Sequence, residues 1–123
     1  SIFCQFNLII RVLGGDAISL KGEKIEFKAT SNYDYDLSSF GPICEFDRLV
    51  FLRFNLEENK LYVYDLDINS EKLKKISVSK TSTVEDYQKQ GKRPRFSIIK
   101  EIIEKNNNTP TVIFNIRRGI IER

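Results

Sequence analysis

The sequence predicts an α+β fold, with a central mixed sheet of about four to five strands flanked by helices. Apolar residues recur at helical spacing near both ends of the chain, which predicts the helices. Between them lie strand-like apolar runs joined by short polar turns, the pattern of hairpins. The 123 residues contain no repeat and no low-complexity linker, so we expect one domain over 1–123. Because the sequence has no Met, not even an initiator, we expect the natural N-terminus to lie upstream of Ser1.

The first half of the chain begins with an expected helix over 2–13. Its apolar positions 2, 3, 6, 8, 9, 12 and 13 fit one broad buried face, and Gly14-Gly15 can end it. Residues 16–30 predict a hairpin that turns at Lys21-Gly22. The stretch 31–42 is interrupted by Asn, Asp, Ser, Gly and Pro, and we expect it to be a loop.

The second half contains both strand and helix patterns. Two strand-like runs enclose a polar turn, and further apolar patterns follow towards the C-terminus. The expected elements are paired strands at 48–54 and 61–68, a short strand at 73–78, a helix at 83–90, a basic loop at 91–95, a helix at 96–105 and a strand at 111–116.

The composition excludes several kinds of catalysis. The chain has no His, which removes Ser-His-Asp and Cys-His nucleophile systems and His-based metal sites. Its two cysteines, Cys4 and Cys44, are too few for a zinc site, and we expect buried free thiols in a reducing, cytoplasmic compartment. No apolar run approaches the roughly 20 residues that a membrane span needs, so we expect no membrane association. Any catalysis must therefore use carboxylates, lysines, tyrosines and a metal.

The charges divide the chain into an acidic and a basic half. Residues 1–70 carry a net charge of −4 and residues 71–123 one of +7, within a total of +3. Such a division suits a protein that holds a cation in one half and a polyanion with the other. An uneven but solvated surface would give the same distribution, and charge alone favours neither interpretation.

Two acids and a lysine in the first hairpin form the candidate catalytic group. Alternate residues of a strand share a face, so Glu26 and Lys28 point the same way. A three-residue loop at 21–23 would place Asp16 opposite Lys28 on that face, whereas a two-residue loop would place it on the other face unless a bulge restored it. Carboxylates bind Mg²⁺, which lowers the pKa of a bound water, and an ammonium can stabilise charge on a phosphate. Taken alone, however, Glu-x-Lys on a strand is more often a pair of surface charges.

Longer motifs surround this group. Gly15-Asp16 followed by Glu26-Phe27-Lys28 resembles the PD-(D/E)xK nuclease signature, with Gly15 in place of the usual Pro. A small family of type II restriction endonucleases is similar over about 13–104, through the segments 26–30 (EFKAT), 36–42 (DLSSFGP), 46–49 (FDRL) and 90–97 (QGKRPRFS).

The resemblance implies a restriction-endonuclease-like nuclease domain that hydrolyses duplex DNA with Mg²⁺ as a sequence-specific homodimer. It implies that Asp16, Glu26 and Lys28 are catalytic. The implied metal ligands are Asp16, Glu26 and the backbone carbonyl of Phe27. Many relatives use a further acid on a helix, and 2–13 offers none, which leaves a second metal unassigned.

The basic segment is the candidate for gripping DNA. Around Pro94 it carries three cations: Lys92, Arg93 and Arg95. Such a loop is more often a solvated turn, but the resemblance favours DNA contact, with phosphate positioning ahead of base reading. Gln90 could read an adenine edge, although exposed helix polarity explains it equally well.

The loop at 36–40 adds two further candidates. Ser38 and Ser39 can reach phosphate if this loop covers the active face. A turn nucleated by Asp36 explains the segment equally well. Two other functions also fit the chain: a structure-selective nuclease for junctions or repair, and a non-catalytic DNA-binding module. Cleavage of plasmid into discrete bands, branch-specific nicks, or no metal-dependent cleavage would separate the three.

Overall fold

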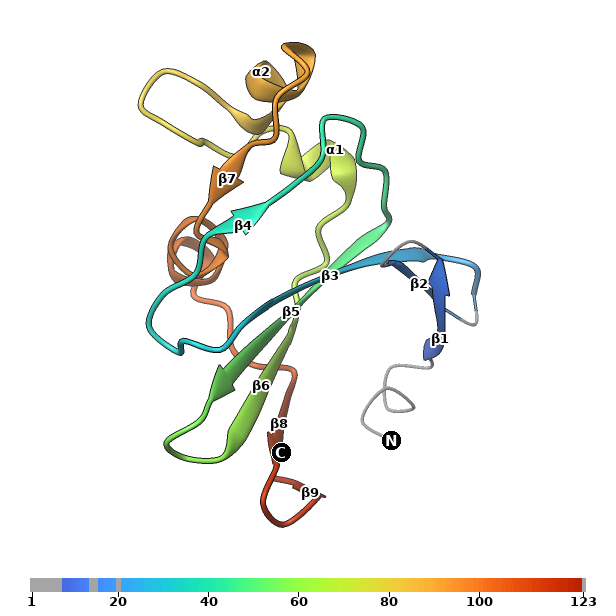
Figure 1. The fold of residues 1–123 in the computed structure, drawn as a ribbon, viewed down its shortest axis with the longest axis vertical. Helices are drawn as coiled ribbons and strands as arrows, with labels where there is room; N and C mark the ends of the chain where they lie inside the picture. The colour runs from blue at the N-terminus through green and yellow to red at the C-terminus, as the bar shows by residue number, and fades with distance from the viewer. Residues whose placement is uncertain (1–7, 14–15, 20, 123) are drawn as a thin grey trace.

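The main structural feature is a seven-stranded sheet with the strand order β1-β2-β3-β5-β6-β8-β9 (Figure 1). The computed structural model describes residues 8–13, 16–19 and 21–122, with the backbone alone described for 8–13 and 16–17. The strands of the sheet are β1 (Leu8–Leu13), β2 (Asp16–Ser19), β3 (Lys24–Thr30), β5 (Arg48–Asn55), β6 (Lys60–Asp65), β8 (Val112–Asn115) and β9 (Ile120–Ile121). β3 and β5 run parallel, and the other neighbouring pairs are antiparallel, so the sheet is mixed as expected.

Both predicted hairpins are confirmed. β2 pairs with β3, and β5 pairs with β6 around a turn at 56–59. The strand predicted at 111–116 is also confirmed, as β8. The sheet exceeds the four to five expected strands because it gains β1 and the two-residue β9 at its edges.

The first predicted helix is wrong over the part that the structure describes. Leu8–Leu13 is a strand, and Ile9 pairs with Ile18 of β2. Residues 2–7 and Gly14-Gly15 lie outside the described residues. Ile9, Ile10 and Val12 are β-branched and favour strands. Pairing with β2 therefore decides the conformation of a segment whose apolar spacing also fits a helix.

The helices are short, so the described part of the fold is mostly β rather than a sheet with helices at both ends. They are α1 (Ser70–Leu73), α2 (Val84–Lys89) and the π-helical η2 (Ile99–Glu104), which lies within a helical stretch at 98–106. The latter two confirm the helices predicted at 83–90 and 96–105. No helix of the described residues is long and apolar enough to cross a membrane.

The strand predicted at 73–78 is wrong. The Asn69 side chain accepts the backbone N–H of Lys72 at 2.9 Å, which starts α1 just before this segment. After α1 the chain forms only an isolated bridge between Ser77 and Thr83. The local cap therefore overrides the apolar alternation that suggested a strand.

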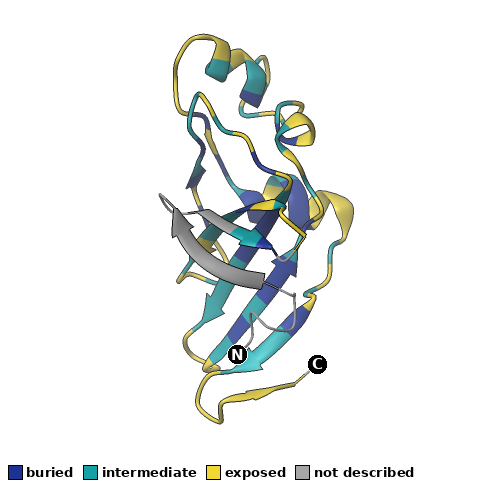
Figure 2. Cartoon of the chain, turned by 90° about the vertical axis from the view of Figure 1, so that its right-hand side faces the viewer, coloured by how far each residue is buried: buried dark blue, intermediate teal, exposed yellow. Residues whose placement is uncertain are grey.

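A second sheet covers one face of the first. It pairs β4 (Ser38–Ser39) with β7 (Arg95–Phe96), so 31–42 is not entirely loop (Figure 1). Phe40, which follows β4, Phe96 of β7 and apolar residues of the helices pack there against the β5 residues Leu49 and Phe51. The intervening Val50 belongs to a separate cluster on the opposite face. Figure 2 shows the buried stretches of the chain in dark blue, including much of the central strands.

Candidate active site

The tight end of the β2–β3 hairpin sets the position of the candidate acids. Gly22 donates its backbone N–H to the Ser19 carbonyl at 3.0 Å, with a φ of 83° that suits glycine. This turn pairs Asp16 with Glu26, and not with Lys28 as the expected 21–23 loop would do. The register differs by two residues, so Asp16 keeps a position on the strand face of Glu26 and Lys28.

The start of β3 is fixed to the start of β5. The Asp47 carboxylate accepts the backbone N–H of Lys24 at 2.8 Å, and the Asp47 N–H donates to the Lys24 carbonyl at 2.8 Å. Arg48 donates to the Glu23 carboxylate at 3.2 Å and also to Asp65. The hydrogen bond to Asp65 is the main reason that the pKa of Arg48 is raised, despite partial burial. These contacts hold the strand with the candidate residues in one register on the central sheet.

Glu26 and Lys28 lie side by side on the face covered by the β4–β7 sheet. Lys28 Nζ is 3.8 Å from Glu26 Oε1, and the lysine and glutamate side chains are 23% and 15% exposed. The Cys44 thiol lies 3.7 Å from the same carboxylate oxygen, and Lys28 Nζ lies 4.8 Å from the centroid of the Phe40 ring. Charges partly withdrawn from water act on their neighbours more strongly than surface charges do. The structure thus brings two of the three predicted catalytic residues together.

The donor set suits a hard cation. Glu26 supplies a carboxylate, the ligand type that Mg²⁺ prefers, and the register places Asp16 directly across from it. Among the side chains that the structure describes, no three acids or cysteines gather to form a metal site. The Asp16 side chain is not among them, so Asp16 is placed beside Glu26 by the pairing of their backbones across β2 and β3.

Asp36 of the DLSSFGP segment is a remote helix cap. It is 3% exposed, and its carboxylate accepts the backbone N–H groups of Ile98 and Ile99 at 2.8 and 3.0 Å. The hydroxyls of Ser38 and Ser97 also donate to it, at 2.9 and 2.7 Å. The first N–H groups of a helix have no partner within the helix, and this carboxylate satisfies two of them. Asp36 therefore holds the helix at 98–106 instead of nucleating a local turn.

The two candidate serines of this segment have different environments. Ser38 is 6% exposed, and its hydroxyl donates to Asp36. Ser39 is half-buried, and its hydroxyl accepts a hydrogen bond from Arg93 Nε at 3.2 Å. Ser39 therefore lies beside the basic segment, whereas Ser38 belongs to the packing beneath it.

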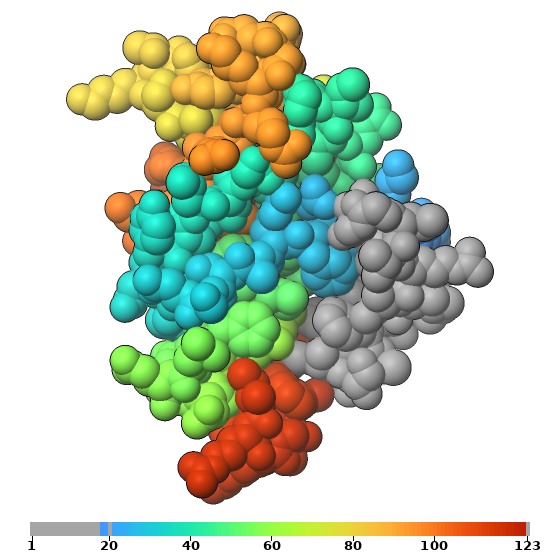
Figure 3. Space-filling view, in the orientation of Figure 1, coloured from blue at the N-terminus to red at the C-terminus, as the bar shows by residue number. Residues whose placement is uncertain are grey.

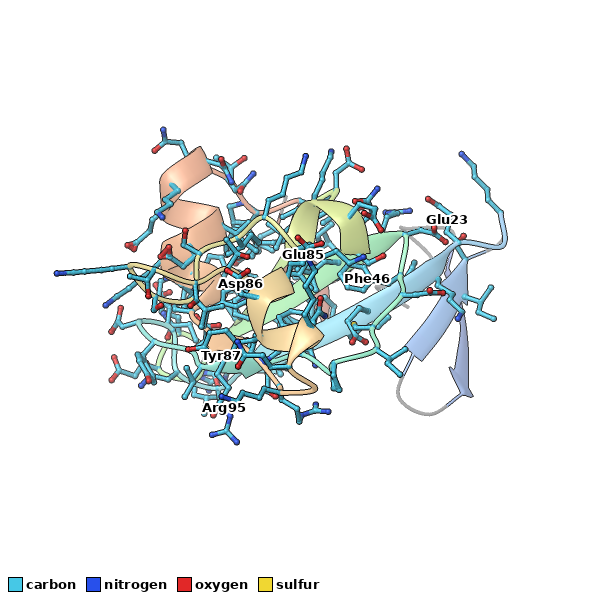
Figure 4. The ribbon with its side chains drawn as sticks, turned by 90° about the horizontal axis from the view of Figure 1, so that it is seen from above. Glu23, Phe46, Glu85, Asp86, Tyr87 and Arg95 are labelled. Atoms are coloured by element: carbon cyan, nitrogen blue, oxygen red, sulfur yellow. The ribbon has the colours of Figure 1, made fainter. Side chains whose placement is uncertain are left out.

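The basic segment packs directly against this motif (Figure 3). Its predicted DNA-contacting residues are all exposed: Gln90, Lys92, Arg93 and Arg95. The segment is anchored by Pro94, which is buried and whose carbonyl accepts the Phe40 N–H at 3.0 Å. Arg95 points away from the body of the fold (Figure 4). The segment thus combines a fixed backbone with cations that face solvent.

Comparison with known proteins gives the family of the chain. A family model described as Bsp6I restriction endonuclease matches residues 2–105. The chain belongs to this family. A relative, the type II restriction enzyme Bsp6I of Bacillus sp. (strain RFL6), is 51% identical over 108 residues. The match covers 87% of this chain and 62% of the relative, so the chain spans less than two thirds of that protein's length. No solved structure matches.

Membership of the Bsp6I family confirms the resemblance to type II restriction endonucleases that the motifs predicted. The structure adds two residues whose place near the site the sequence did not predict. Cys44, interpreted as a buried thiol, is half-buried beside Glu26, and Phe40 lies under Lys28. Both contacts cross at least a dozen residues, so no local spacing could have indicated them.

Proposed function

We propose that this chain is the catalytic part of a Mg²⁺-dependent endonuclease that cuts duplex DNA at a specific sequence. The observation that carries the proposal is the pairing of Asp16 with Glu26 across a hairpin whose Lys28 ammonium lies 3.8 Å from the Glu26 carboxylate. The relative's name, a type II restriction enzyme, supports the same reaction. Action as a homodimer and in the cytoplasm are parts of this proposal.

The acidic residues hold the metal in this proposal. Asp16, Glu26 and the backbone carbonyl of Phe27 supply oxygen ligands from two adjacent strands. A Mg²⁺ ion held by these ligands would supply an activated water molecule and positive charge to offset the charge that develops on the phosphate. The 15% exposure of Glu26 limits competition from bulk water for its carboxylate.

Lys28 acts on the reacting phosphate. Its ammonium has three donors on a flexible stem, and the Glu26 carboxylate keeps it on the face of β3 where the metal would bind. A cation fixed there stabilises the extra negative charge of the transition state or orients the attacking water. The residue therefore contributes to rate more than to DNA affinity.

The basic segment grips the DNA. Lys92 and Arg95 are exposed cations suited to phosphates, and such contacts position a protein on the duplex without reading its sequence. Arg93 is oriented through its Nε by Ser39, which makes it the better candidate for a base contact. Gln90 and Ser39 are proposed as accessory contacts. Ser38 could join them only by releasing Asp36.

The test is cleavage of supercoiled plasmid with Mg²⁺, followed by sequencing of the ends. We expect discrete fragments, and Lys28→Ala should slow cleavage by ~10²-fold while DNA affinity in Ca²⁺ changes little. Lys24→Ala is the matched control, because Lys24 is an exposed lysine of the same strand. Asp16→Ala and Glu26→Ala should likewise cleave slowly and still bind.

The outcomes separate the competing functions. If cleavage is confined to nicks in branched DNA, the protein is a structure-selective nuclease and not a restriction enzyme. Binding without any metal-dependent cleavage would overturn the catalytic proposal and leave a DNA-binding module. A Lys28→Ala variant that binds poorly but cleaves normally at saturation would remove Lys28 from the transition state.

A further inference from the structure

The Lys28 ammonium lies close to both a carboxylate and an aromatic face. Glu26 Oε1 is 3.8 Å away, which is too far for a direct hydrogen bond. The centroid of the Phe40 ring is 4.8 Å away. Lysine is a long, flexible side chain, so a loose ion pair alone leaves its end several accessible positions. The ring face supplies a second contact that restricts them.

The Phe40 ring is itself held firmly. Phe40 is fully buried, and its ring stacks on Phe96 at 5.4 Å and 13° and on Phe46 at 6.4 Å and 29°. The face of an aromatic ring carries negative charge density, which attracts an ammonium within about 6 Å, and more strongly where water is partly excluded. Lys28 is only 23% exposed, so this attraction operates with limited screening.

The backbone of Phe40 connects this contact to the basic segment. Its N–H donates to the Pro94 carbonyl at 3.0 Å, and the preceding residue, Ser39, pairs with Arg95 and accepts a hydrogen bond from Arg93. The residue under the candidate catalytic lysine is therefore bonded to the segment that carries the candidate DNA-binding cations.

We propose that Phe40 is the positioning residue of Lys28: its ring face holds the ammonium beside Glu26, and its backbone N–H ties that position to the basic segment. This inference rests on the proposed nuclease function. It also gives the DLSSFGP motif a role, because Asp36 fixes one end of the segment and Phe40 presents the ring.

The decisive experiment replaces Phe40 by phenylalanines with one, two and three ring fluorines in the intact protein. Fluorine leaves the shape of the ring nearly unchanged but withdraws charge from its face, which weakens the attraction stepwise. We expect the single-turnover cleavage rate to fall with each fluorine, by about 2- to 30-fold for complete loss of the interaction. DNA affinity in Ca²⁺ should stay constant. A residue that only fills space would give no graded response.

Matched controls isolate the contact with Lys28. The same fluorine series at Phe46, which stacks on Phe40 but is not in the cation–π contact with Lys28, should leave the rate unchanged. In a Lys28→Ala background, fluorination of Phe40 should have no effect. Nuclear magnetic resonance gives a readout without activity: the ε-methylene protons of Lys28 should be shifted upfield by the ring current, and Phe40→Leu should remove that shift.

Each outcome decides one question. A flat response to fluorine at Phe40 in a protein that cleaves DNA would overturn the positioning role and leave the proposed function intact. Equal responses at Phe40 and Phe46, or a response that persists in Lys28→Ala, would overturn it as well. A wild-type protein without Mg²⁺-dependent cleavage would overturn the proposed function, and the chemical shift of Lys28 would still decide whether the ring holds the ammonium.

Discussion

Replacing Asp36 by Asn changes one of the two oxygens that hold 36–40 to the helix at 98–106. Each oxygen of the carboxylate accepts one backbone N–H and one hydroxyl, Oδ1 from Ile99 and Ser97 and Oδ2 from Ile98 and Ser38. In either orientation of an amide, its NH₂ group would face one of the two backbone N–H donors. The hydroxyls can rotate and find other partners, whereas that N–H cannot.

The loss of stability follows from the number of buried N–H donors that are left without an acceptor. A buried donor without a partner costs about 1–3 kcal/mol, so Asp36→Asn should lower the free energy of unfolding by roughly 2 kcal/mol. Asp36→Ala strands both N–H groups and should cost about twice as much. The site is 3% exposed, so water cannot replace the lost acceptor without further opening of the structure.

Urea unfolding followed by circular dichroism measures both values. Asp34→Asn is the matched control, because Asp34 is exposed and two positions away, and it should stay within about 0.5 kcal/mol of the wild type. The reasoning fails if Asp36→Asn and Asp36→Ala are also within that range. It fails equally if the two variants lose the same amount, since the argument counts donors.

Three further results are expected. Arg95→Ala should weaken binding to all DNA sequences alike and lower the slope of log affinity against log salt concentration by about 1. Arg93→Ala should reduce the binding free energy by ~1–3 kcal/mol, mainly on the specific duplex. Unchanged affinity and slope in both variants would show that the segment is a solvated turn. Burial, together with a hydrogen bond to Glu58, raises the pKa of Tyr62 from 10.0 to about 12. Folding therefore favours the protonated phenol, so stability should fall as the pH rises from about 10 to 12. The midpoint of urea unfolding measures this, and in Tyr62→Phe the midpoint should fall less over the same pH range. Gly22→Ala should destabilise by ~1–2 kcal/mol, because a β-carbon disfavours a φ of 83° even in open space, and a neutral change would contradict the turn geometry.

Elements with local causes were predictable from the sequence. The β5–β6 hairpin follows from two apolar runs around a polar turn, and Asn59 adopts the positive φ that such a turn requires. The Glu26–Lys28 pair follows from the two-residue period of a strand. In both cases the residues that decide the structure lie within a few positions of one another.

Elements decided by pairing with another segment were not predictable from apolar spacing. Leu8–Leu13 has a spacing that also fits a helix, and its pairing with β2 selects the strand. The β4 and β7 strands have two residues each and exist because they pair with one another across the chain. The cap at Asp36 acts on a backbone N–H 62 residues away, a distance that no motif or period indicates.

The separation between Asp36 and its helix also fixes an order of assembly during synthesis. A nascent chain that ends before residue 95 already contains Asp16, Glu26 and Lys28, but it lacks the partner strand of β4 and the N–H donors to Asp36. Contacts between residues this far apart close late, after the local hairpins have formed. The β2–β3 hairpin that bears the two acids can thus form before Phe96 stacks on the Phe40 ring beneath the lysine. If the proposed function holds, chains that end before residue 95 should lack the full set of contacts that position Lys28.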